Sequence, residues 1–205
     1  MIYAKYGKRF LDLGVGFVIL GLTSPLLLVS AILIPIETKG GIFFIQHRVG
    51  KDLEVFRIFK FRTMTKENRK VGNKPLIGKA AGVTKVGYIL RRLKIDELPQ
   101  LISVISGRMS LVGPRPSVPE QLKQMSEREK ERYSVKPGLT GLAQVSGNIH
   151  LTWKERYQKD LEYVENISLL NDLRILTRTF FLLFHGEAFY LDKPMKIIHY
   201  RNYET

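Results

Sequence analysis

Residues 10–36 read FLDLGVGFVILGLTSPLLLVSAILIPI, and this apolar run decides how the rest of the chain can be arranged. Asp12 is its only charged side chain. As one straight helix the run would extend about 40 Å, which is enough to cross a hydrocarbon core of ~30 Å. A membrane-associated segment is therefore expected at the N-terminal end of the chain.

Ser24-Pro25 stands near the middle of this run. Proline removes a backbone hydrogen bond and clashes with the preceding turn, so the helix is expected to kink or break there. Each half then extends roughly 18–20 Å, which is too short to cross the bilayer alone. The hydroxyl groups of Thr23 and Ser24 are candidates to bond the backbone groups that the break frees.

Basic residues flank the run on both sides: Lys5, Lys8, Arg9, Lys39, Arg48 and Lys51. Basic flanks mark the cytoplasmic side, so both ends are expected there, and residues 1–36 are predicted to form a re-entrant hairpin in one leaflet. A spanning helix that tolerates the proline and a signal peptide cleaved after Ala31 stay open as alternatives. Cleavage is disfavoured because the apolar run continues to Ile36, whereas signal sequences use only ~7–15 apolar residues.

The chain has 205 residues, no cysteine and a net charge of +14. Without cysteine it has no disulfide, iron–sulfur site or thiol nucleophile. A pI near 10 favours an anionic partner, whether nucleic acid, phospholipid or a phosphorylated substrate. Residues 1–36 carry +2, which leaves +12 for residues 37–205. We expect residues 37–205 to form one cytoplasmic domain seated on the membrane element.

The pattern beyond the apolar run predicts an α+β fold with more helix than strand. Two short strands, 42–45 and 53–61, are expected to form a hairpin around a loop at 47–52. Helices, several of them amphipathic, are predicted over 84–93, 96–106, 120–133, 153–166 and 172–184. Loops are predicted over 65–82 and 136–141.

The sharpest local feature is the sequence RRLKIDELP at residues 91–99. Pro99 fits only a first helical turn, which makes Asp96 the expected N-cap and Glu97 the first helical residue. The helix dipole favours negative charge there and draws phosphate oxygens close. An ionised carboxylate among cations suits a nucleophile toward phosphorus or a ligand for Mg2+. On spacing alone, a plain helix cap with solvated charges is the favoured interpretation.

Other motifs offer groups to a phosphate. Arg115 lies between two prolines that restrict the backbone, which suits a guanidinium held in fixed geometry. Lys60 and Arg62 lie two residues apart at a strand end, where they can clamp an anion or remain solvated edge charges. The glycines of residues 136–145 resemble an anion-binding loop only loosely, and the four histidines show no metal-ligand spacing.

Six features stand in order along residues 1–185: the basic N-terminus, the run broken at Ser24-Pro25, KFRTM at 60–64, DELPQ at 96–100, GPRP at 113–116 and KPGLTGLAQ at 136–144. Together they resemble the small monotopic phosphoglycosyl transferases, the bacterial sugar transferases that begin glycoconjugate assembly. The chain resembles the minimal form of that family, and every motif is intact. This resemblance reverses the preference for a plain cap at the acidic pair.

The resemblance implies transfer of sugar-1-phosphate from a UDP-sugar to a polyprenyl phosphate such as undecaprenyl phosphate, with release of UMP. It assigns Asp96 as the nucleophile of a ping-pong reaction and as part of the Mg2+ site, with Glu97 as its supporting neighbour. Ser24 and Pro25 carry over as the hairpin break. By motif position, the substrate-binding candidates are Arg91, Arg115, Lys60, Arg62 and Gln144.

The expected partners are the UDP-sugar, the polyprenyl phosphate and membrane phospholipid at the cytoplasmic face of the bacterial inner membrane. A homodimer is one open option. The main rival is a membrane-anchored nucleic-acid-binding module, which needs basic residues interleaved with exposed aromatics. Here the basic residues gather around phosphate-suited motifs instead, so no nucleic acid is expected. An inactive scaffold is a second rival, and the intact Asp96-Glu97 pair argues against it.

Overall fold

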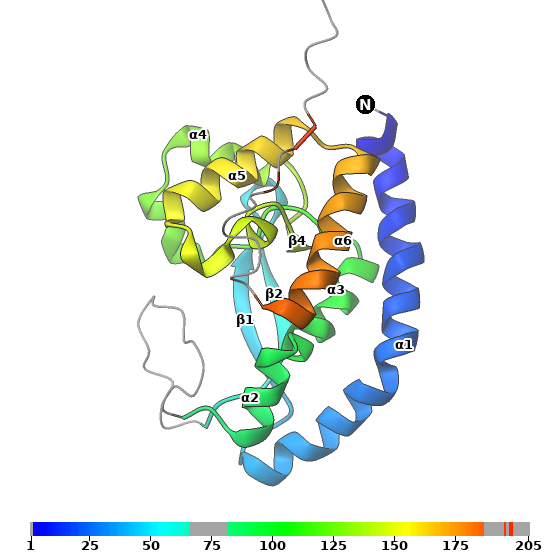
Figure 1. Ribbon diagram of the computed structural model, residues 1–205. Coiled ribbons are helices and arrows are strands. Elements are labelled where there is room, and N and C mark those ends of the chain that lie inside the picture. Colours follow the sequence, from blue (N-terminus) through cyan, green and yellow to red (C-terminus); the bar gives the residue numbers. More distant parts are fainter. Residues whose placement is uncertain (1, 66–81, 187–194, 196, 199–205) are drawn as a thin grey trace, which may run out of the picture.

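The computed structural model describes residues 2–65, 82–186, 195 and 197–198, and it is mainly helical with small sheets (Figure 1). The longer helices are α1 (Lys8–Glu37), α2 (Lys85–Arg92), α5 (Trp153–Glu165) and α6 (Leu169–His185), with the short α3 (Leu101–Ile105) and α4 (Glu127–Lys130). The strands are β1 (Phe43–Val49), β2 (Val55–Phe61), β3 (Ser110–Val112) and β4 (Gly138–Thr140). A π-helical turn, η1 (Tyr3–Gly7), precedes α1, and the 3₁₀ turns are η2 (Lys51–Leu53), η3 (Ile95–Gln100), η4 (Pro119–Gln124), η5 (Glu131–Ser134), η6 (Gln144–Ser146) and η7 (Asn148–His150).

The predicted hairpin is confirmed as β1 and β2, which pair antiparallel with Phe43 opposite Phe61 and Val49 opposite Val55. Its connection is shorter than predicted because β1 continues through Val49. The helices predicted at 84–93, 153–166 and 172–184 are confirmed as α2, α5 and α6. The loop predicted at 65–82 lies almost entirely outside the described residues.

Two helix predictions need correction. The segment 96–106 is divided between η3 and α3, and the segment 120–133 is divided among η4, α4 and η5. Ser126 begins α4 as an N-cap, with its side chain accepting a hydrogen bond from the Glu129 amide. A cap in the middle of the charged segment starts a new turn, so the predicted long helix does not form.

The break predicted at Ser24-Pro25 is a bend in one continuous helix. Figure 1 shows α1 running down one side of the molecule and turning at the bottom to pass under α2. Proline at position 25 leaves the carbonyl of Gly21 without its helical amide partner. The Ser24 hydroxyl donates to that carbonyl at 2.8 Å, and the Thr23 hydroxyl donates to the carbonyl of Ile19 at 2.7 Å. The expected role is confirmed for Ser24, whereas Thr23 bonds a carbonyl that Pro25 does not free.

The first half of α1 is fixed to the head, the body formed by residues 38–65 and 82–186 together with 195 and 197–198. The buried Asp12 carboxylate accepts hydrogen bonds from the Ser110 hydroxyl at 2.9 Å and the Leu111 amide at 2.8 Å. Lys8 forms an ion pair of 2.6 Å with Asp172 of α6. The only charged side chain in the apolar run is thus buried and hydrogen-bonded to β3.

The far end of α1 is fixed to the same head. Ile34 is buried in a cluster with Phe61, Leu90 and Ile95. The Glu37 carboxylate accepts a hydrogen bond of 2.8 Å from the Val86 amide at the start of α2. Both ends of the apolar helix α1 therefore contact one body.

The middle of α1 leaves a broad apolar surface uncovered. Only 11% of its most apolar stretch is buried against protein, unlike the core helix of a soluble domain. By length and composition, it is the one helix in the described part of the chain that is able to cross a membrane. Its exposed side chains include Phe10, Phe17, Val18, Leu22, Leu28, Val29, Ile32 and Ile36.

Beneath α1, the main core surrounds the parallel pair β3 and β4. Buried side chains of α3, β3 and α6, such as Val104, Leu111 and Ile175, form its centre. A Cβ added to Gly138 would lie 2.1 Å from the Gly113 nitrogen, and one added to Gly141 would lie 2.1 Å from the Gly113 oxygen. These glycines of the 136–145 motif therefore permit close backbone packing beside β3.

We expect Gly138→Ala to lower the free energy of unfolding by about 3 kcal/mol or more, because its methyl group collides with backbone that cannot move aside. Gly14→Ala is the matched control, since a Cβ there meets nothing within 4 Å. Thermal unfolding in detergent measures both variants. Equal stability of the two would contradict the close approach of the segments at Gly113 and Gly138.

Candidate active site

Asp96 and Glu97 lie in η3, which leads directly into α3. The expectation that Asp96 is an N-cap is wrong, because Lys94 holds that position with a left-handed φ of 57°. Pro99 has no amide hydrogen to donate, and the segment around it is a 3₁₀ turn that ends at Gln100, before α3 begins at Leu101. A short turn, and not the start of a long helix, presents both carboxylates.

The Glu97 carboxylate is fully engaged by two cations. Its Oε1 accepts from Lys60 Nζ at 2.6 Å and from Arg115 Nη2 at 2.7 Å, and its Oε2 accepts from Arg115 Nη1 at 3.3 Å. Burial alone would raise the pKa of Glu97, but the charges of Arg115 and Lys60 hold it well below its usual range. Glu97 is therefore ionised and joins β2, η3 and the loop after β3.

Asp96 differs from its neighbour. Within the described residues its carboxylate makes no hydrogen bond and no ion pair, and it is half-buried. Burial, followed by the negative charge of Glu97, raises the pKa of Asp96 to about 6, against the opposing charges of Lys60, Arg91 and Lys94. At neutral pH it is mostly ionised, and its oxygens are available to a ligand or an electrophile.

Arg91 stands in the last turn of α2, close enough for its charge to act on Asp96. Its Nε donates to the Thr63 hydroxyl at 2.9 Å. Its Nη1 is buried and has no acceptor among the residues that the structure describes. Buried donors without an acceptor are rare in folded proteins, so this guanidinium is suited to receive an oxygen from a substrate.

Arg62 and Gln144, two of the predicted substrate-binding residues, do not bond to Glu97 in the described structure. Arg62 donates to the carbonyl of Phe43 at 3.3 Å, which ties it to the end of the hairpin, whereas Lys60 reaches Glu97. Gln144 lies in η6, and both polar atoms of its amide are buried without a hydrogen-bond partner in the described part of the chain. The Gln144 side chain lies close to Gly141, because a Cβ added to Gly141 would be 2.9 Å from Oε1 of Gln144.

The buried ion pair of Arg132 and Asp160 supports the Arg115 loop and was missed in the sequence. Each side chain is 2% exposed. Arg132 also donates to the Arg115 carbonyl at 2.7 Å, and its guanidinium lies 5.0 and 5.1 Å from the ring centres of Tyr133 and Tyr157. In the sequence Arg132 looks like one more charge of a solvated helix, because its carboxylate partner lies 28 positions away.

Arg48 supports the same loop from β1. Its Nη1 donates to the Pro116 carbonyl at 3.1 Å, and its Nη2 donates to the Gln46 side chain at 2.7 Å. The sequence marked Arg48 only as a basic flank of the apolar run. Its proximity to the site follows from its hydrogen bond to Pro116, the residue after Arg115.

The residues at this site fit a magnesium ion held in part by substrate. No group of three or more His, Cys, Asp or Glu side chains suited to a metal occurs in the described residues. Glu97 is committed to Lys60 and Arg115, which leaves the Asp96 carboxylate as a ligand. Mg2+ in phosphoryl-transfer sites is commonly held by one or two carboxylates together with substrate phosphates and water, and Asp96 supplies this donor type.

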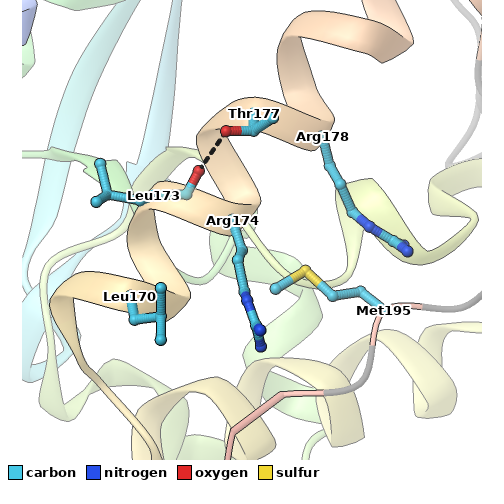
Figure 2. A pocket seen from close by; sticks show the side chains of 6 residues that line it. All are labelled: Leu170, Leu173, Arg174, Thr177, Arg178 and Met195. Carbon is cyan, nitrogen blue, oxygen red and sulfur yellow. Dashed lines mark hydrogen bonds between the residues drawn. The ribbon is translucent and has the colours of Figure 1, made fainter.

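A separate groove of about 460 Å3 lies along α6 (Figure 2). None of the predicted site residues lines it, and Figure 2 shows its two arginines on the same helix as its leucines. The acidic pair and this groove are therefore distinct features. The lining residues are Leu170, Leu173, Arg174, Thr177, Arg178 and Met195.

Comparison with known proteins gives consistent matches. The family model described as bacterial sugar transferase matches residues 3–186. The chain is 40% identical over 172 residues to the "Uncharacterized sugar transferase EpsL" of Bacillus subtilis, covering 84% of each chain.

Two longer relatives carry more specific names. The chain is 37% identical over 187 residues to the "UDP-N-acetylgalactosamine-undecaprenyl-phosphate N-acetylgalactosaminephosphotransferase" of Aeromonas hydrophila, covering 87% of this chain and 43% of the relative. It is 39% identical over 192 residues to the "UDP-glucose:undecaprenyl-phosphate glucose-1-phosphate transferase" of Escherichia coli, covering 89% and 41%. The chain spans less than half the length of these two relatives.

Arg132→Ala should destabilise the protein by about 3–5 kcal/mol, because it leaves the Asp160 carboxylate buried without its partner. Lys130→Ala is the matched control, since it removes an ion pair with Glu127, which is 91% exposed, and should cost at most about 1 kcal/mol. Thermal unfolding measures both. A stable Arg132→Ala protein would show that the buried pair does not hold the loop.

Proposed function

Because this chain belongs to the bacterial sugar transferase family, we propose that it transfers sugar-1-phosphate from a UDP-sugar to undecaprenyl phosphate or a related polyprenyl phosphate. It is a transferase enzyme. The names of the Aeromonas and Escherichia relatives support the donor and acceptor classes. The observation that carries the proposal is the pair of adjacent carboxylates, in which Glu97 is bound by Lys60 and Arg115 while Asp96 is open to a substrate.

The sugar has to be found by measurement. The Aeromonas relative is named for N-acetylgalactosamine and the Escherichia relative for glucose, at 37% and 39% identity. Because the chain is about equally similar to relatives named for two different sugars, the comparison favours neither sugar. The proposal is therefore a UDP-sugar as a class.

In the first half-reaction, an Asp96 oxygen attacks the β-phosphorus of the UDP-sugar. The bond from that phosphorus to the bridging oxygen breaks, and UMP leaves with this oxygen and its electron pair. A phosphosugar bound to Asp96 remains. Since Asp96 is mostly ionised above its pKa of about 6, no base is needed to activate it at neutral pH.

In the second half-reaction, a phosphate oxygen of the polyprenyl phosphate attacks the same phosphorus. The bond between that phosphorus and the Asp96 oxygen breaks, which restores the carboxylate and yields polyprenyl diphosphate sugar. Glu97 is not the nucleophile, because both its oxygens accept hydrogen bonds from cations. Its proposed role is to hold Lys60 and Arg115 beside the reacting phosphate.

Charge on the transferring phosphoryl group is neutralised by Arg91 and Arg115 in this proposal. When bound at Asp96, Mg2+ would supply Lewis-acid stabilisation of the phosphate oxygens. Arg62 and Gln144 stay as substrate contacts predicted by their motifs. The orphaned amide of Gln144 supports a polar ligand at its position.

The re-entrant arrangement is part of the proposal. A spanning helix separates its ends by at least the ~30 Å hydrocarbon core. Here Asp12 and Glu37, near the two ends of α1, both bond to the same head, which supports a hairpin with both ends on one side. The basic flanks favour the cytoplasmic face of the bacterial inner membrane, and the +12 of residues 37–205 suits anionic headgroups.

The activity test is UMP release by the purified protein in lipid nanodiscs with Mg2+, a panel of UDP-sugars, and undecaprenyl phosphate present or absent. We expect sustained release only with the lipid, and a loss of at least about 1,000-fold in Asp96→Asn, as for removal of a nucleophile. Asp52→Asn is the matched control, because Asp52 lies in an exposed turn at a φ of 53° that asparagine tolerates. Full activity of Asp96→Asn would refute the assigned nucleophile, and no lipid-dependent release with any sugar would refute the function.

The absence of cysteine makes the topology directly testable. Single cysteines at Lys5 and Lys39 should both react with a membrane-impermeant maleimide in inverted vesicles and both be protected in intact spheroplasts. A cysteine at Leu28, in the exposed apolar middle of α1, should be protected in both. Labelling of Lys5→Cys and Lys39→Cys from opposite sides would establish a spanning helix instead.

A further inference from the structure

Arg48 is a partly buried cation that forms no ion pair with a carboxylate among the residues that the structure describes. Its hydrogen bonds go to neutral acceptors, the Pro116 carbonyl and the Gln46 amide oxygen. Its Nε is buried and has no acceptor, and within the described residues it forms no ion pair. Buried charges in proteins are normally paired, so an unpaired guanidinium indicates a missing anion.

The charged side chains around Arg48 also include more cations than carboxylates. Four cations, Arg48, Lys60, Arg91 and Arg115, gather near two carboxylates, Asp96 and Glu97. This group of six carries a surplus of two positive charges, with the exposed Lys94 and Glu120 both left out. Burial and then the repulsion of Arg115 lower the pKa of Arg48 to about 10, although Glu97 and Glu120 oppose this change. Arg48 is still a cation at neutral pH, and a phosphate dianion would balance the group.

The proposed reaction indicates where this phosphate lies, and the inference rests on that proposed function. Both displacements occur at one phosphorus, with Asp96 attacking in the first and leaving in the second. In phosphoryl transfer the attacking and leaving oxygens stand roughly in line. The UMP phosphate therefore leaves from the position, opposite Asp96, that the polyprenyl phosphate occupies afterwards.

We propose that Arg48, beside Arg115, is a phosphate-binding residue of this shared position and binds first the phosphate of UMP and then that of the polyprenyl acceptor. A guanidinium offers a planar fork of donors that matches phosphate oxygens. The Nε of Arg48 is available for this contact, and its bond to Pro116 keeps it next to the Arg115 loop. One cationic position then serves both half-reactions.

The test is steady-state kinetics of Arg48→Gln with UDP-sugar, polyprenyl phosphate and UMP as product inhibitor. We expect KM for both substrates and the inhibition constant of UMP to rise by a similar factor, about 10- to 100-fold, as for the loss of a hydrogen bond to a charged group. Arg48→Lys keeps the charge but not the fork and should show a smaller rise in all three. Arg57→Gln, on an exposed position of the same hairpin, should match the wild type.

Equilibrium binding of UMP and of uridine separates failure of this inference from failure of the transferase function. Wild-type protein should bind UMP more tightly than uridine, and Arg48→Gln should lose most of that difference, whether or not turnover is detected. If Arg48→Gln does not fold, Arg48→Lys decides by the same comparison. A rise in KM for only one substrate, or a fall in kcat with both KM values and UMP binding unchanged, would overturn the shared position and leave Arg48 as a support for the loop.

Discussion

The rest of the site depends on the ion pairs that Glu97 forms with Lys60 and Arg115. They join the hairpin, the η3 turn and the loop after β3 through one half-buried carboxylate. They also make two adjacent acids unequal. The cations hold the pKa of Glu97 low, whereas burial and then the negative charge of Glu97 raise the pKa of Asp96. Two carboxylates in one site acquire different roles when their surroundings move their pKa values apart.

The apolar helix α1 is hydrogen-bonded to the elements that carry the site. Asp12, the one charge in the apolar run, bonds to Ser110 and Leu111 of β3, and β3 leads directly into the loop that carries Arg115. A short path of covalent and hydrogen-bonded contacts thus runs from α1 to Glu97. This arrangement fixes the carboxylates at a constant position relative to the exposed apolar surface of α1.

The excess positive charge of the chain is used in two ways. Arg132 is neutralised internally by Asp160 and holds the Arg115 backbone from inside the fold. Near the acidic pair, by contrast, Arg91 and Arg48 retain buried donors without acceptors in the described residues. The paired Arg132 supports the loop, whereas Arg91 and Arg48 have donors that are suited to bind an anion. The net charge by itself does not separate these two uses.

The sequence by itself determined the elements that local patterns encode: the apolar run and its bend at Pro25, the β1–β2 hairpin, the amphipathic helices, and the acidic pair among cations. It misplaced Asp96 as an N-cap and merged residues 120–133 into one helix, because single capping and proline positions alter helices in ways that periodicity does not record. Only the tertiary structure selected Glu97 as the partner of Lys60 and Arg115 and brought Arg48 and Arg132 to the Arg115 loop. These contacts join residues far apart in the chain, and a buried charge has the same appearance in a sequence as a solvated one until its partner is known.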